Sequence, residues 1–180
     1  MAARAGQHCS FSGGDDLDVV AWCRSNANGA AHPVGQKLSN GFGIFDMSGN
    51  VAEWCLNGGG IAGRIVCGGS WNFKTASCAI EQICWAFSDL GDSGIGFRVC
   101  LVPESIFPLH TAGASSGMPR TEGPECLKVE TMDVDLGTGI SIKMNKIPGR
   151  NYWMAVSELT QAQYELITDK NPSAVKVNTK

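Results

Sequence analysis

The chain has 180 residues, of which 43% are hydrophobic and 17% are charged, and its net charge is −3 at neutral pH. This balance excludes an intrinsically disordered chain, which would have fewer apolar and more charged residues. The sequence has no cluster of Lys or Arg and its pI is near 5.6, which argues against nucleic acid as a partner. No apolar run is long enough to span a bilayer, so we expect no membrane insertion.

Glycine, tryptophan and cysteine set the general character of the fold. Twenty-three glycines and five tryptophans favour a loop-rich fold over a helical bundle. The cysteines do not form a zinc motif, and two interpretations stay open: buried small hydrophobic residues, or one or two disulfides. The eight cysteines are at positions 9, 23, 55, 67, 78, 84, 100 and 126.

The first block of the chain comprises residues 1–102. Its short apolar runs at 17–23 and 64–67 are bounded by Gly and Asp, and they predict brief strands or turns. The block ends in a strand-like segment, GIGFRVCLV, at 94–102. Residues 103–126 are rich in Pro, Gly and Ser and are interpreted as a linker.

The second block, residues 127–180, has a different pattern. Polar and apolar residues alternate from Val129 to Asp135, and apolar residues return at Ile140 and beyond, which predicts a hairpin. Thr160 and Gln163 resemble a capping box at the start of a short helix. That helix should end before Asn171, because a residue that precedes proline avoids the helical conformation.

A loop between positions 46 and 53 carries the first candidate site. Two carboxylates, an amide and several backbone carbonyls fall close together there, and such hard oxygens are the ligands of Ca²⁺. The alternative is a polar turn capped by Asp46 and Asn50. The residues alone do not decide between these interpretations.

Motifs along the first block resemble one protein family. They are AARAG at 2–6, HPVGQK at 32–37, NGFGIFDMSGNVAEWC at 40–55, GGSW at 68–71 and IGFRV at 95–99. In this order they are similar to the second half of a sulfatase-modifying-factor domain, the family of the formylglycine-generating enzyme. The resemblance implies an α+β fold of the C-type-lectin-like kind, with short strands and few helices. It also implies a structural Ca²⁺ held by side chains of Asp46 and Glu53 and by carbonyls of Gly49 and Val51.

The second block resembles the opening of the same domain, at NYWMAVSELTQAQYELITDKNPS, 151–173. We therefore expect residues 1–102 to be a C-terminal half and residues 127–180 an N-terminal segment, in inverted order. Three explanations stay open: a fragment that runs into a tandem neighbour, a start codon assigned at an internal Met, or a circular permutation. A fragment of a larger tandem protein is favoured, and the compartment is then not readable from the start of the chain.

The catalytic chemistry of the family depends on copper. In the formylglycine-generating enzyme, two cysteine thiolates five positions apart hold Cu(I) after the GGS motif, and soft thiolates suit that ion. Here these positions fall on Phe73 and Cys78. A single thiolate cannot reproduce the site, so we expect no Cu(I) and a non-catalytic binding module. The alternative is an oxidoreductase that converts a protein cysteine to formylglycine through Cys78 and copper.

A ligand surface is expected between GGSW and GFRV. Phe73, Trp85 and Phe87 stand there among polar residues, a mixture typical of adaptable recognition surfaces. The expected ligand is a protein or peptide, and the alternative is a plain folded loop. Arg98 should form an ion pair, with a partner among Asp16, Asp18 and Glu53.

Overall fold

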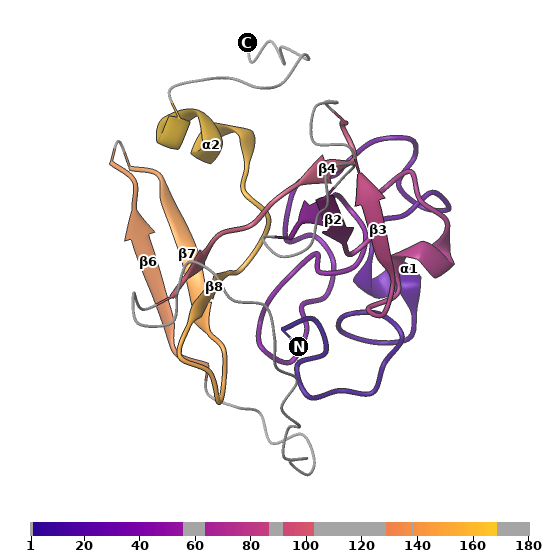
Figure 1. Ribbon diagram of the computed structural model, residues 1–180, viewed down its shortest axis with the longest axis horizontal. Coiled ribbons are helices and arrows are strands. Elements are labelled where there is room, and N and C mark those ends of the chain that lie inside the picture. Colours follow the sequence, from indigo (N-terminus) through magenta and orange to yellow (C-terminus); the bar gives the residue numbers. More distant parts are fainter. Residues whose placement is uncertain (1, 56–63, 87–91, 103–128, 138, 169–180) are drawn as a thin grey trace.

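Short strands form two sheets in the computed structural model, which describes residues 2–55, 64–86, 92–102, 129–137 and 139–168 (Figure 1). The first sheet has the order β3-β2-β1-β4, and the second has the order β5-β8-β7-β6. Their strands are β1 (Ala52–Trp54), β2 (Arg64–Cys67), β3 (Ile83–Ala86), β4 (Ile95–Gly96), β5 (Cys100–Leu101), β6 (Thr131–Asp135), β7 (Ser141–Lys146) and β8 (Trp153–Ala155). The helical elements are α1 (Leu17–Val20), the 3₁₀ helix η1 (Thr75–Cys78) and α2 (Gln161–Thr168). The described chain is thus α+β, with short strands and little helix.

Two short apolar runs of the first block have different outcomes. The run at 64–67 is a strand, as predicted. The other run begins with α1, a single helical turn, because the side chain of Asp16 accepts a hydrogen bond from Asp18 N at 3.1 Å and caps the turn. The predicted linker at 103–126 and the predicted helix end before Asn171 lie outside the described residues. None of the helices within the described ranges has the length and apolarity needed to cross a bilayer.

The predicted hairpin is formed by β6 and β7. Its register places Met132 opposite Met144 and Val134 opposite Ile142, so apolar side chains of both strands face one core cluster. The capping box of α2 is also confirmed, since Gln163 N donates to Thr160 Oγ1 at 3.3 Å and Thr160 N donates to Gln163 Oε1 at 2.9 Å.

The described part of the second block packs against the first block. The chain leaves β4, reaches the second sheet as β5 and pairs there with β8 (Figure 1). Ala155 N donates to Val99 O at 3.0 Å. Ile147 completes a core cluster with Ala2, Ala5, Phe42 and Ile44. The second block therefore supplies both a sheet partner and core side chains, while the three explanations of the inverted order stay predictions.

Candidate functional site

The loop at 46–50 is held in one shape by its contact with Trp22. Asn50 N donates to Trp22 O at 2.8 Å, and Gly49 forms a parallel bridge with Trp22. Gly49 has φ +75°, and a Cβ there would lie 2.2 Å from Trp22 O. Because the obstructing atom belongs to the backbone, a larger residue cannot be accommodated by a side-chain movement. This close approach fixes where Asp46 and Asn50 stand.

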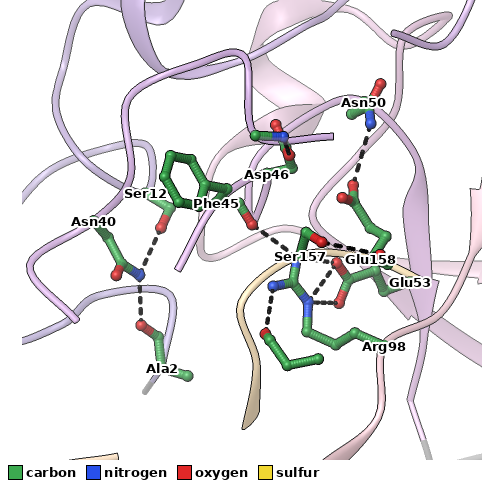
Figure 2. Close-up of polar contacts among 12 residues, drawn as sticks. Ala2, Ser12, Asn40, Phe45, Asp46, Asn50, Glu53, Arg98, Ser157 and Glu158 are labelled. Carbon is green, nitrogen blue, oxygen red and sulfur yellow. Dashed lines mark hydrogen bonds and ion pairs between the residues drawn. The ribbon is translucent and has the colours of Figure 1, made fainter. Parts of the chain in front are cut away.

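A buried ion pair lies beside this loop (Figure 2). Arg98 Nε donates to both oxygens of Glu53 at 2.8 Å, and its Nη2 also contacts Glu53 Oε1. The guanidinium donates further to Phe45 O at 2.9 Å and to Ala155 O at 3.2 Å. The expectation that Arg98 forms an ion pair is confirmed, and its partner is Glu53.

Two further carboxyl groups, those of Asp46 and Glu158, are buried near Arg98. Asp46 Oδ2 accepts from Gly35 N at 2.7 Å. Glu158 Oε1 accepts from Asn50 Nδ2 at 3.5 Å (Figure 2). The other oxygen of each, Asp46 Oδ1 and Glu158 Oε2, is buried without a hydrogen-bond partner. Three carboxyl groups therefore surround one guanidinium.

The pKa values of Glu158 and Asp46 are raised in this cluster. Burial raises the pKa of Glu158 well above its ordinary value, and the negative charges of Asp46 and Glu53 raise it further. Burial also raises the pKa of Asp46, against the lowering effects of the Gly35 hydrogen bond, of Arg98 and of a hydrogen bond with the protonated carboxyl of Glu158. Arg98 is ionised, and the charge of Glu53 favours that state. Glu158 therefore holds its proton to a higher pH than an ordinary glutamate does.

The predicted Ca²⁺ ligands fit a cation in part. Asp46 Oδ1 is a buried oxygen that could bind a cation, and its alternative partner is the protonated carboxyl of Glu158. Both oxygens of Glu53 accept hydrogen bonds from Arg98. An ionised carboxylate has about four lone-pair sites, so Glu53 could coordinate a cation while it remains bound to Arg98. Among the described residues, no group of three His, Cys, Asp or Glu side chains has the geometry of a metal site. Any such site would need the carbonyls of Gly49 and Val51, so Ca²⁺ stays a prediction.

Cys78, the remaining position of the copper motif, lies in the core. Its exposure is 0%, and it ends η1 in a cluster with Cys23, against which Phe73 packs. Burial, with smaller contributions from Cys23 and Cys84, raises the pKa of Cys78 to about 12. A buried thiol that stays protonated is a poor nucleophile and a poor metal ligand. Gly69 of the GGSW motif permits this packing because it lacks a side chain. A Cβ at that position would lie 2.7 Å from Cys78 Sγ.

The three residues of the predicted ligand surface do not share one environment. Trp85 is 64% exposed, and Ile83 on the same strand is 59% exposed. Phe73 is half-buried against the cluster of Cys23 and Cys78. Phe87 lies outside the described residues. The exposed apolar pair on β3 is therefore Ile83 and Trp85, and Ile83 was not predicted.

A pair of cysteines lies on the same sheet. Cys55 donates its S–H to Cys67 Sγ, with the two sulfurs 3.4 Å apart. Burial, followed by the contact with Cys67, raises the pKa of Cys55 to about 12. The thiol next to Cys55 is thus that of Cys67. In the described chain all cysteines are free thiols.

Comparison with known proteins decides the family. A family model described as the sulfatase-modifying factor enzyme 1-like domain matches residues 1–102.

The chain belongs to this family.

The sulfatase-modifying-factor domain described above also matches individual proteins over part of their length. Chaperone protein LppX of Paenibacillus barcinonensis is 38% identical, over 27% of this chain and 24% of that protein. The solved structure of Treponema denticola variable protein 1 is 30% identical with a TM-score of 0.50, over 53% of this chain and 42% of that one. The crystal structure of CarF matches at 27% identity with a TM-score of 0.42, over 49% and 35% of the two chains. The chain thus spans less than half of each relative, and its fold is the predicted C-type-lectin-like α+β fold.

Proposed function

We propose that this sulfatase-modifying-factor domain is a non-catalytic module that binds a protein or peptide ligand. The observation that carries this proposal is that the two positions of the copper motif offer no pair of accessible thiolates. Phe73 stands where the first thiolate is needed, and Cys78 is fully buried in the same apolar cluster. Neither residue offers an accessible ligand for a soft metal ion.

The proposed binding surface is the exposed side of β3. Ile83 and Trp85 are two positions apart on a strand, so their side chains point to one face. β3 is the first strand in the order of its sheet, and such an edge can pair with an added strand. An extended peptide with apolar side chains suits both features, because its backbone can extend the sheet while its side chains cover Trp85.

A peptide library selected against the full chain tests this surface. We expect selected peptides to lose at least tenfold in affinity for Trp85→Ala, because exposed aromatic side chains often dominate binding energy. Leu38→Ala is the matched control, since Leu38 is an exposed apolar residue outside β3, with 55% exposure. Equal affinity for the wild type, Trp85→Ala and Ile83→Ala would overturn the assignment of the surface.

We further propose Ca²⁺ as a structural ion of the loop at 46–53. The support is Asp46 Oδ1, a buried oxygen whose one alternative partner among the described residues is the protonated carboxyl of Glu158. Bound there, the ion would neutralise part of the negative charge of the cluster around Arg98. Asp46 and Glu53 would supply side-chain oxygens, and Gly49 and Val51 would supply carbonyls.

A further inference from the structure

The neighbouring thiols of Cys55 and Cys67 are not used by the proposed function. Cys67 ends β2, and Cys55 directly follows the last residue of β1. Glu53 is opposite Cys67 in the register, and Cys55 N donates to Ile65 O at 2.9 Å. The two cysteines are therefore diagonal neighbours on one face of an antiparallel pair.

We propose that Cys55 and Cys67 are a modification site that forms a cross-strand disulfide by exchange with a low-molecular-weight disulfide of the glutathione type. The sulfurs are 3.4 Å apart, so closure to a bond of about 2.05 Å needs a relative movement of about 1.4 Å. Both residues are half-buried, so neither is enclosed in the core as Cys23 and Cys78 are.

The exchange balances in two steps. Cys67 loses its proton to solvent, and its thiolate attacks a sulfur of the small disulfide, whose S–S bond breaks and releases one small thiolate. Cys55, whose S–H points at Cys67 Sγ, then loses its proton to solvent as it attacks the Cys67 sulfur of the mixed disulfide, which releases the second small thiolate. The protein loses two electrons and two protons, and the small disulfide gains both to become two thiols.

The position of the pair distinguishes it from Cys23, Cys78 and Cys84. Cys23 and Cys78 are fully buried in the core. Cys84 lies opposite Val66 in the register, on the other face of the sheet from Cys67. Cys67 itself is opposite Ile83, so the disulfide would form on the face that carries the exposed side chains of β3. The inference does not depend on ligand binding at that face.

The test is an equilibration of the full chain with mixtures of reduced and oxidised glutathione, followed by alkylation and peptide mass mapping. We expect one linked peptide pair, joining Cys55 to Cys67, that is about 2 Da lighter than the two free thiol peptides. The equilibrium constant for this link in the native chain should exceed the value in concentrated urea at least tenfold, because the fold holds the thiols together.

Two variants separate a specific site from general oxidation. Cys67→Ser should leave Cys55 either free or as a mixed disulfide with glutathione. The matched control Cys84→Ser should keep the native link and its equilibrium constant. The proposal is overturned if both thiols are alkylated after treatment with oxidised glutathione, if the native constant does not exceed the one in urea, or if Cys55 pairs equally with other cysteines.

Discussion

Arg98 binds Glu53 through both carboxylate oxygens and at the same time donates to the carbonyls of Phe45 and Ala155. Glu53 belongs to β1 and Ala155 to β8, so one guanidinium connects the first sheet, the loop at 45–46 and the second block of the chain. Both side chains of the pair are largely buried, with 3% exposure for Arg98 and 14% for Glu53. The connection is therefore shielded from solvent and salt.

Removal of the charge on Glu53 should be costly. We expect Glu53→Gln to lower the free energy of unfolding by about 3–5 kcal/mol, because a buried guanidinium loses its main partner. The control is Glu81→Gln, since Glu81 pairs with Arg4 and its side chain is 78% exposed. This variant should lose less than about 1 kcal/mol of unfolding free energy. Urea unfolding measures both values, and equal losses would show that Arg98 does not depend on Glu53.

The raised pKa of Glu158 predicts a stability loss as the pH rises. The folded protein holds this proton more tightly than the unfolded chain, whose Glu has an ordinary pKa of 4.5. The stabilising effect is complete below pH 4.5 and is lost as the pH rises through the higher pKa of the folded state. Within that window the loss is about 1.4 kcal/mol per pH unit.

Glu158→Gln tests this pH dependence, because glutamine mimics the protonated carboxyl. Urea unfolding in Ca²⁺-free buffer above pH 4.5 should show a smaller loss of stability for the variant than for the wild type. Glu130→Gln, at an exposed position, should keep the wild-type slope. If the unfolding free energies of the wild type and of Glu158→Gln changed identically with pH, the raised pKa of Glu158 would be contradicted.

The contact between Gly49 and Trp22 predicts an unusually large effect of a methyl group. Gly49→Ala should destabilise the protein by about 4 kcal/mol or more, because the new Cβ meets backbone at 2.2 Å and the φ is positive. Gly137→Ala has a similar φ of +83° with nothing within 4 Å of the added Cβ, so it should cost about 1–2 kcal/mol. Thermal unfolding of the two variants measures the difference, and a loss for Gly49→Ala no greater than for Gly137→Ala would refute the tight contact.

Calcium titration tests the proposed structural ion. Ca²⁺ should raise the thermal midpoint of the wild type, by an amount that increases with ion concentration. Asp46→Asn should weaken this response, and Mg²⁺ should be less effective because it requires a stricter geometry. The absence of any shift and of any binding heat for the wild type would contradict the proposal.

The sequence predicted features that depend on local patterns. The alternation from Val129 to Asp135 and the apolar residues from Ile140 onward predicted the hairpin, and Thr160 and Gln163 predicted the capping box. The motif at 40–55 predicted the family, which the match over residues 1–102 confirms. Arg98 between apolar neighbours predicted an ion pair, although three partners were open.

The features that the sequence did not predict depend on long-range contacts. Glu158 meets Asn50 across 108 positions, and nothing near the SELT segment marks its carboxyl as buried. Cys55 and Cys67 come together through the register of β1 and β2, which their spacing does not specify. The run at 17–23, interpreted as a brief strand or turn, begins with one helical turn that Asp16 caps.

The most direct test of the central claim is an assay for formylglycine. The full chain is incubated with Cu(I), O₂ and a cysteine-containing peptide, and the peptide is examined by mass spectrometry. We predict no aldehyde, because Phe73 replaces one thiolate and the Cys78 thiol is fully buried with a raised pKa. Phe73→Cys serves as the comparison, since it restores the first thiolate of the motif. Aldehyde formation by the wild type that is lost in Cys78→Ala would contradict the account and establish an oxidase.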